Sequence, residues 1–338
     1  MEGTLGHGTM IFLVFIGSVF LSVTLLTPEL LLSNIDDSAA HLRVGKGDVA
    51  LSQIIPTYVE HAIADTIKPR LRGVTTKSVG APSGKESTRS ILRNSFRYGS
   101  SHIDWCEQNY LIVDFIAEFY NTVSNIPFLI LPPVVIYLYA PYSLYVDAGV
   151  NWVWVLLMVV GAGSGYFHAT LTLSGQLFDE WAILWVMMAA LSLWTPTEWT
   201  RNTIFQNRLH FKVFMLAVAV LFTYLACLYP AINAFLLFAF GVPTFGIVKN
   251  GYEFDKNASA GRVKQMTIAS VAWISVAVFF WINDRLFCKL WTEFFVLHGY
   301  SYPQLHALWH VCVLCGAYTG TVLGSYFKAR NQFPHLNP

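Results

Sequence analysis

The sequence predicts an all-α membrane protein: a seven-transmembrane helix bundle with an additional N-terminal hydrophobic segment. Two observations predict this fold class. Of the 338 residues, 55% are hydrophobic and only 12% are charged, which leaves too little polar surface for a soluble domain. The apolar residues also come in long runs rather than amphipathic stripes, and about twenty helical residues cross the hydrocarbon core of a bilayer.

Seven strong apolar runs account for the predicted helices. They cover residues 116–138, 150–171, 177–194, 211–229, 232–248, 266–282 and 305–326. A shorter run at 10–26 lies in an N-terminal segment, 1–32, that we interpret as a signal peptide or anchor. Residues 33–99 are polar and lack periodicity, which is typical of a flexible linker. We expect the helical domain over 100–330 and a short C-terminal tail over 331–338.

Basic residues in the loops predict the orientation of the bundle. If the first strong run starts outside, nine basic residues lie on the inner side: Arg201, Arg208, Lys212, Lys249, Lys256, Arg262, Lys264, Lys328 and Arg330. Only two, Arg285 and Lys289, lie in the outer loops. This bias predicts that the seven-helix unit begins outside, in the lumen or exterior, and that the C-terminus lies inside.

The charge pattern gives no indication of a nucleic-acid partner. The net charge is +1, and the Lys and Arg residues are scattered without forming a basic helix. The partner that the composition does indicate is the bilayer itself, since the apolar runs are long enough to span it.

Three histidines at the ends of apolar runs are the leading candidate metal ligands, because ionisable groups at membrane depth are costly. His168 ends the second run, and His306 and His310 open the seventh. A spacing of four places His306 and His310 on one helix face. The predicted topology brings all three to the outer end, and three histidines plus an open position are typical of catalytic zinc. Hydrogen-bonded packing histidines are the alternative.

Two further candidates lie at the same end. Asp179 begins the third run, where a carboxylate could take a proton from an attacking water and pass it to a leaving amine. An acid that complements the helix dipole is the alternative, and it is the favoured one for the adjacent Glu180. Ser164 lies one turn before His168 and could donate a hydrogen bond to a developing oxyanion. Taken alone, Ser164 is better explained as a small residue in a Gly-rich helix contact.

An acidic segment precedes the first run and also lies on the outer side. It contains Asp104, Glu107, Asn109 and Glu118. Hard oxygen ligands in a short loop suit Ca²⁺, although the spacing is not that of an EF-hand. The residues alone favour an acidic interfacial segment with a capping Glu.

Two cysteines and one aspartate complete the set of outer candidates. Cys106 and Cys288 are both expected outside, where a disulfide can persist. Asp284 either supports a histidine ligand or pairs with Arg285, and the sequence leaves both possibilities open.

Several strings in this chain together resemble the signatures of the alkaline ceramidases, and their wording is closest to the Golgi-type alkaline ceramidase. The strings are Asp104-Trp-Cys-Glu-Gln-Asn-Tyr with Ala117-Glu-Phe-Tyr-Asn-Thr-Val-Ser-Asn125, Tyr166-Phe-His-Ala-Thr-Leu with Gly175-Gln-Leu-Phe-Asp-Glu180, Trp281-Ile-Asn-Asp-Arg-Leu-Phe-Cys288 and Leu305-His-Ala-Leu-Trp-His310. The resemblance covers about residues 100–328, and it includes all seven strong runs.

The resemblance implies a zinc-dependent intramembrane hydrolase of sphingolipid metabolism that splits ceramide into sphingosine and a fatty acid. By similarity, His168, His306 and His310 would bind zinc, and Ser164 and Asp179 would serve the reaction. Calcium would be bound by Asp104, Trp105, Glu107, Asn109 and Glu118, and Cys106 would be disulfide-bonded to Cys288. The outer side would then be the lumen of the Golgi or endoplasmic reticulum, with the C-terminus in the cytosol.

Two other classes share part of this pattern. One is a seven-helix lipid-sensing receptor of the adiponectin and progestin receptor type, which has a similar set of Ser, His and Asp residues. The other is a structural or transport protein with a non-catalytic zinc. Release of a lipid product separates the enzyme from the receptor. A tightly bound metal with a saturated fourth ligand would indicate the structural or transport protein.

Overall fold

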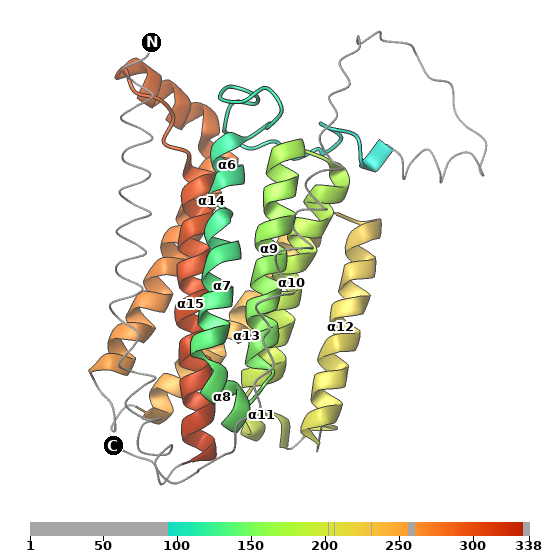
Figure 1. Cartoon of the computed structure of the whole chain (residues 1–338), viewed down its shortest axis with the longest axis vertical. Helices are drawn as coiled ribbons and strands as arrows, with labels where there is room; N and C mark the ends of the chain where they lie inside the picture. Colours follow the sequence, from blue (N-terminus) through green and yellow to red (C-terminus); the bar gives the residue numbers. More distant parts are fainter. Residues whose placement is uncertain (1–93, 202, 206, 231, 256–260, 334–338) are drawn as a thin grey trace, which may run out of the picture.

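The computed structural model describes residues 94–201, 203–205, 207–230, 232–255 and 261–333, and within them all regular elements are helices (Figure 1). The helices are α6 (Phe119–Val123), α7 (Ile126–Leu138), α8 (Ala140–Tyr145), α9 (Val150–Thr170), α10 (Leu173–Trp194), α11 (Thr197–Arg201), α12 (Arg208–Leu228), α13 (Ile232–Asp255), α14 (Arg262–Leu297) and α15 (Leu305–Gln332). The apolar run at 10–26 and most of the 33–99 linker lie outside the described residues.

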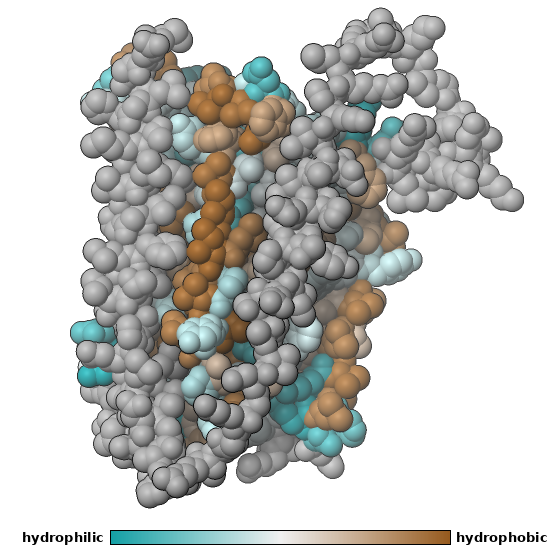
Figure 2. Space-filling view, viewed as in Figure 1, coloured by the Kyte–Doolittle hydropathy of each residue, from teal (hydrophilic) through white to brown (hydrophobic). Residues whose placement is uncertain are grey.

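Seven of these helical segments are long and apolar enough to cross a bilayer, which confirms the predicted fold class. The first is α6 and α7 together, Phe119–Leu138, and α9, α10, α12, α13, α14 and α15 supply the others. On the face shown in Figure 2, hydrophobic side chains follow the length of the described helices, and hydrophilic ones gather mostly toward the two ends. This is the distribution that a bilayer-spanning bundle requires.

The first span is broken close to one end. α6 stops after Val123 and α7 begins at Ile126, with Pro127 in its first turn. Proline has no backbone N–H and fits best in the first turn of a helix, so Pro127 suits the start of α7, although α7 also contains Pro132 and Pro133 in its interior. The break therefore leaves Ser124 and Asn125 between two helices, where both side chains are buried in the bundle.

A tight turn joins α9 to α10. Leu171 ends α9 in the left-handed region, with φ of 47°, and Thr172 caps α10 by accepting a hydrogen bond from Gly175 N. A Cβ atom on Gly175 would lie 2.8 Å from Thr172 Oγ1 and 2.9 Å from Phe167 Cα, so only glycine fits there. The turn brings the end of α9, with His168, next to the start of α10, with Asp179.

α15 is the central helix of the bundle, and it packs closely against α14 (Figure 1). Small residues allow close approach to two neighbours: a Cβ atom on Gly316 would clash with Ile274 of α14, and one on Gly324 would clash with the ring of Trp194 of α10. Close contact through small residues is a usual way for membrane helices to associate. The helix that carries His306 and His310 is therefore enclosed by the others.

Candidate metal centre

The three histidines meet at one end of the bundle, between α9 and α15. One ligand atom from each of His168, His306 and His310 lies within 4.8 Å of the others. The three ring centroids are 4.7–5.0 Å apart, and all three side chains are buried. Within the part of the chain that the structure describes, this is the one group of three or more His, Cys, Asp or Glu side chains that could hold a metal ion.

Hydrogen bonds to the far sides of the rings fix how two of the histidines face. Ser124 Oγ donates its hydrogen to the carbonyl of Asn121, so it must accept a hydrogen bond from His310 Nδ1, at 2.7 Å. With its proton on Nδ1, neutral His310 has a lone pair on Nε2 that can bind a metal ion. His168 Nδ1 contacts the carboxylate of Glu118. A carboxylate on the outer nitrogen orients a metal-binding imidazole and raises its basicity.

The inward-facing nitrogens meet the requirement for metal ligands. Nε2 of His168 and Nδ1 of His306 are buried, and neither has a hydrogen-bond partner among the described residues. Buried polar atoms nearly always have a partner, so two such atoms beside a third imidazole indicate a ligand. Three neutral imidazoles suit Zn²⁺ and leave one coordination position open.

Ser164 and Asp179 border the histidine cluster. Ser164 Oγ lies 3.4 Å from His310 Nε2, one turn before His168 on α9. Asp179, at the start of α10 and half-buried, interacts with the Ser164 side chain. A carboxylate and a hydroxyl thus stand next to the open side of the cluster. The adjacent Glu180 points elsewhere: it accepts hydrogen bonds from Gln176, at 3.1 Å, and from Asn233 of α13.

The five candidate calcium ligands lie in one loop and at the end of that loop. Asn109 Nδ2 donates to Asp104 Oδ1 at 3.0 Å, and the Trp105 backbone N–H donates to Glu118 Oε1 at 2.9 Å. Glu107 accepts from the backbone N–H groups of Tyr120 and Asn121 at the start of α6, at 2.6 and 2.8 Å. Glu118 Oε2 contacts both Asn121 Nδ2 and His168 Nδ1. The carboxylate oxygens of Asp104 and Glu107 each accept at most one of these hydrogen bonds, so the loop retains hard oxygen donors that suit Ca²⁺.

Burial dominates the electrostatics of this loop. It raises the pKa of Glu107 to about 7, although the backbone N–H groups that Glu107 binds act in the opposite direction. It also raises the pKa of Glu118 to about 8, against the hydrogen bonds from Asn121 and Trp105. Two acids that are buried close together are the kind of group that a bound cation stabilises in its ionised form.

Trp105 links the acidic loop to the histidines in a way that the sequence did not reveal. Its indole ring stacks on His306, with centroids 3.6 Å apart and an angle of 23° between the planes. The guanidinium of Arg285 also lies over the Trp105 ring, 5.6 Å from its centroid. The next residue of the loop, Cys106, forms a disulfide with Cys288 of α14, with an S–S distance of 2.04 Å.

Asp284 supports the main chain that carries His306. Its carboxylate accepts hydrogen bonds from His306 N at 3.1 Å, Cys106 N at 3.1 Å and the Tyr302 hydroxyl at 2.6 Å. Of the two roles left open by the sequence, Asp284 therefore has the one directed at a histidine, and it acts on the backbone rather than on the ring. Arg285 contacts Trp105 instead.

Comparison with known proteins places the same residues in a family. The Ceramidase family profile matches residues 97–337. The chain is 45% identical to the alkaline ceramidase of Drosophila melanogaster over 242 residues, which are 72% of this chain and 82% of the relative. It is 36% identical to alkaline ceramidase 1 of Homo sapiens over 239 residues, 71% of this chain and 87% of the relative.

A third relative, the alkaline ceramidase of Caenorhabditis elegans, is 32% identical over 246 residues, which are 72% of this chain and 87% of the relative. The matched region contains every residue of the histidine cluster and of the acidic loop. The seven-span fold and these three similarities lead to one conclusion: this chain belongs to the ceramidase family of hydrolases.

Proposed function

We propose that this protein hydrolyses the amide bond of ceramide to release sphingosine and a free fatty acid, at a zinc ion held by His168, His306 and His310. The observation that carries the proposal is the buried imidazole cluster, in which two ring nitrogens have no hydrogen-bond partner among the described residues. The names of the relatives support the choice of ceramide. We assign the activity to the domain over residues 100–330.

When bound, the zinc ion would act as a Lewis acid that polarises the amide carbonyl and lowers the pKa of water. Glu118 and Ser124 hold the outer nitrogens of His168 and His310, so the two rings keep their orientation toward the cluster. Asp284 and Trp105 hold the third histidine, His306, through its backbone and its ring face.

The reacting protons are assigned to Asp179. Its carboxylate takes a proton from the attacking water as the new C–O bond forms. Ser164 donates a hydrogen bond to the carbonyl oxygen while that oxygen carries negative charge. Asp179 then gives the proton to the sphingosine nitrogen as the C–N bond breaks, which leaves a fatty acid and an amine. The two chains of ceramide remain in the bilayer, so we infer that the lipid enters sideways between helices.

The decisive experiment compares the purified full-length wild type with His306→Ala in detergent. We expect the wild type to bind zinc and release fatty acid from ceramide, and the variant to insert and fold but to lose both properties. Near-normal hydrolysis by His306→Ala would sink the assignment. A folded, zinc-loaded wild type that releases nothing would instead favour the lipid-sensing receptor.

We further propose that Ca²⁺ binds the loop formed by Asp104, Trp105, Glu107, Asn109 and Glu118 and fixes its shape. Glu118 contacts both Trp105 and His168, so a change in the shape of this loop would change the position of the His168 ring. A chelator that removes calcium but spares zinc should lower activity, and added calcium should restore it. Unchanged activity in that chelator, with zinc content verified, counts against the calcium site.

We infer that the histidine end faces the lumen of the Golgi or endoplasmic reticulum and that the C-terminus is cytosolic. The excess of basic residues at the opposite end supports this orientation, and so does a disulfide at the histidine end, since disulfides persist in oxidising compartments. A C-terminal epitope that antibodies reach after permeabilisation of the plasma membrane alone would agree with it. An epitope that antibodies reach only after the organelle membrane is also permeabilised would mean that the C-terminus is lumenal, which contradicts this orientation.

A further inference from the structure

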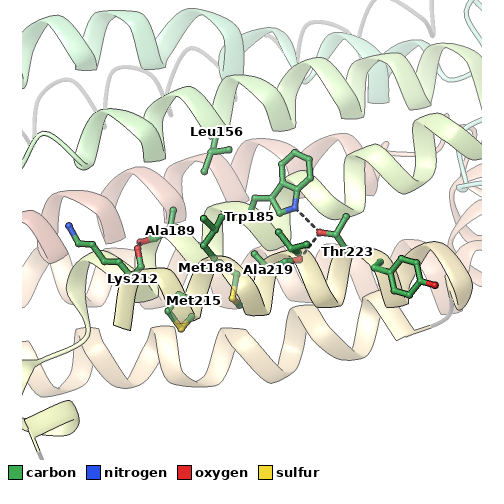
Figure 3. A pocket seen from close by; sticks show the side chains of 12 residues that line it. Leu156, Trp185, Met188, Ala189, Lys212, Met215, Ala219 and Thr223 are labelled. Carbon is green, nitrogen blue, oxygen red and sulfur yellow. Dashed lines mark hydrogen bonds between the residues drawn. The ribbon is translucent and has the colours of Figure 1, made fainter. Parts of the chain in front are cut away.

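A groove between α10 and α12 takes no part in the metal centre. It has a volume of about 600 Å³, within the range of pockets that hold small molecules (Figure 3). α10 lines it with Trp185, Met188 and Ala189, and α12 lines it with Met215 and Ala219. The three α10 residues follow the spacing of one helix face. The walls of the groove are therefore mostly apolar and belong mainly to two neighbouring spans, with Leu156 of α9 as a further lining residue.

The groove opens toward the bilayer. α12 stands at the edge of the bundle and packs mainly against α10 (Figure 1). Leu216 and Val220, which also line the groove, are 65% and 63% exposed. Side chains with this exposure on a membrane span face lipid, so acyl chains have direct access to the groove.

Its length matches one leaflet. Along α12 the lining runs from Lys212 to Tyr224, which corresponds to about 18 Å of helix. The hydrocarbon core of a bilayer is about 30 Å thick, so one leaflet contributes about 15 Å. A groove of this length, parallel to the spans, has the dimensions of a single acyl chain that starts at the headgroup level.

One end of the groove lies at a hydrogen-bonded contact between α10 and α12. Trp185 Nε1 donates to Thr223 Oγ1 at 2.9 Å, and this hydroxyl donates in turn to the Ala219 carbonyl at 2.8 Å (Figure 3). The polar atoms of Trp185 and Thr223 are thus paired within the protein. Asp179 lies six residues before Trp185 on α10, about 9 Å along the axis. The groove is therefore separate from the reacting groups.

The other end of the groove carries excess positive charge. Lys212 Nζ lies 3.8 Å from the carboxylate of Asp147, but that carboxylate already binds Lys328. Arg208, one turn earlier on α12, donates to backbone carbonyls such as that of Thr195 at 2.6 Å. Three cations thus share one carboxylate at the level where lipid headgroups lie.

We propose that this groove binds one acyl chain of an acidic phospholipid whose anionic headgroup pairs with Lys212. The apolar walls accept the chain, the Trp185–Thr223 contact marks its end, and the excess of cations selects an anionic headgroup. Basic sites between membrane helices recognise anionic lipid headgroups in this way. The site does not depend on zinc or on the hydrolysis of ceramide.

The test uses the full-length protein in phosphatidylcholine nanodiscs that contain a small fraction of phosphatidylserine with a photoreactive acyl chain. Two matched arms carry the same photoreactive chain on phosphatidylcholine and on ceramide. Crosslinked peptides are identified by mass spectrometry. We expect phosphatidylserine to label the groove-lining residues of α10, and α12 between Lys212 and Tyr224, about fivefold more strongly than phosphatidylcholine does. One lysine near the membrane surface increases the affinity for an anionic lipid by about this factor.

Three variants sharpen the result. Lys212→Gln should reduce the phosphatidylserine label to the phosphatidylcholine level, whereas Lys264→Gln, an exposed lysine on α14, should leave it unchanged. Ala189→Phe should fill the groove and abolish the label without changing the zinc content. Equal labelling by the two phospholipids, an undiminished label in Lys212→Gln, or preferential labelling by ceramide would each overturn the proposal.

Discussion

α14 and α15 are the two longest helices of the bundle and lie side by side, yet most of α14 is exposed on the outside of the bundle whereas most of α15 is enclosed by protein. In the most apolar stretch of α15, 72% of the residues are buried, against 17% in that of α14. α15 carries His306 and His310, whereas α14 turns side chains such as Phe279 and Leu286 outward. Of these two helices, the enclosed one thus carries two of the three candidate metal ligands.

The exposed helix α14 still contributes to the candidate site, but only through the turn that contains Asp284 and Cys288. Asp284 is 2% exposed and binds the backbone of His306, and Cys288 one turn later joins α14 to the acidic loop. Away from this turn most of α14 faces lipid. We therefore expect a substitution to affect activity or stability according to how far the side chain is buried in protein, rather than according to how hydrophobic it is. Four predictions test this rule, from the largest expected effect to the smallest.

The largest effect is expected inside α15. His310→Ala removes one of three imidazoles, and activity should fall by more than about 100-fold, beyond what loss of a supporting contact causes. Zinc content and fatty-acid release from purified protein measure this. Phe279→Ala, on the lipid face of α14, is the control and should retain both. An active, zinc-free His310→Ala would remove the distinction between the two helices.

The next largest effect is expected at Asp284, where α14 contacts the candidate metal site. Asp284→Asn replaces one acceptor oxygen with an N–H donor, which then faces the donors Cys106 N, His306 N or Tyr302 hydroxyl. We expect a 10- to 100-fold loss of zinc affinity or activity, as for other groups that position a metal ligand. Titration with zinc and the rate of hydrolysis both report it. If the neighbouring Leu286→Ala were equally harmful, Asp284 would have no special role.

A smaller effect, on stability, is expected from alanine substitutions at two glycines of α15. A Cβ atom on Gly324 would lie 2.6 Å from the ring of Trp194, whereas one on Gly320 would meet nothing closer than Ser270 Oγ at 3.7 Å. Gly324→Ala should lower the free energy of unfolding by about 1–3 kcal/mol through overpacking. Gly320→Ala should raise it by up to about 1 kcal/mol, because alanine favours a helix. Thermal unfolding in detergent tests the pair, and a reversed order would contradict the packing.

The smallest effect lies at the far end of α15, where Lys328 binds Asp147. Burial alone would raise the pKa of Asp147, but hydrogen bonds from Lys328 and Gly149 N lower it below its ordinary value of 3.8. The pair therefore stabilises the fold above pH 3.8 and stops doing so as the pH falls through the lowered pKa. Asp147→Asn should cost less than about 1 kcal/mol near neutral pH.

Thermal unfolding as a function of pH checks this prediction. The difference in midpoint between wild type and Asp147→Asn should shrink as the medium is acidified and vanish at the lowest pH that the protein tolerates. A difference that stays constant, or grows with acidification, would show that the carboxylate contributes by something other than its charge.

The number and place of the spans could be predicted because burial in lipid imposes one simple condition on sequence. The run at 150–171 corresponds to α9, Val150–Thr170, and the run at 305–326 to the start of α15. The sixth run ended in the prediction at residue 282, but α14 continues to Leu297. Asp284 and Arg285 interrupt the apolar run there, because they contact protein rather than lipid, and hydropathy cannot tell the two apart.

The candidate site was only partly predictable for a related reason. Three histidines at run ends on one side of the membrane could be brought together by counting spans. The contact of Glu118 with His168, fifty positions along the chain, and the stacking of Trp105 on His306 depend on how a loop folds back over the bundle. No periodicity encodes such contacts, and so the acidic segment remained ambiguous until its neighbours were known.

The placement of two histidines on the last of the seven described spans also has a consequence for biosynthesis. A nascent chain that has delivered α9 to the membrane holds His168 alone, and His306 and His310 leave the ribosome only after six spans have been made. The centre therefore cannot form before α15 has been made. A chain that stalls, or is cut before α15, joins the bilayer without a place for the ion, so that insertion and catalytic competence are separate events in time.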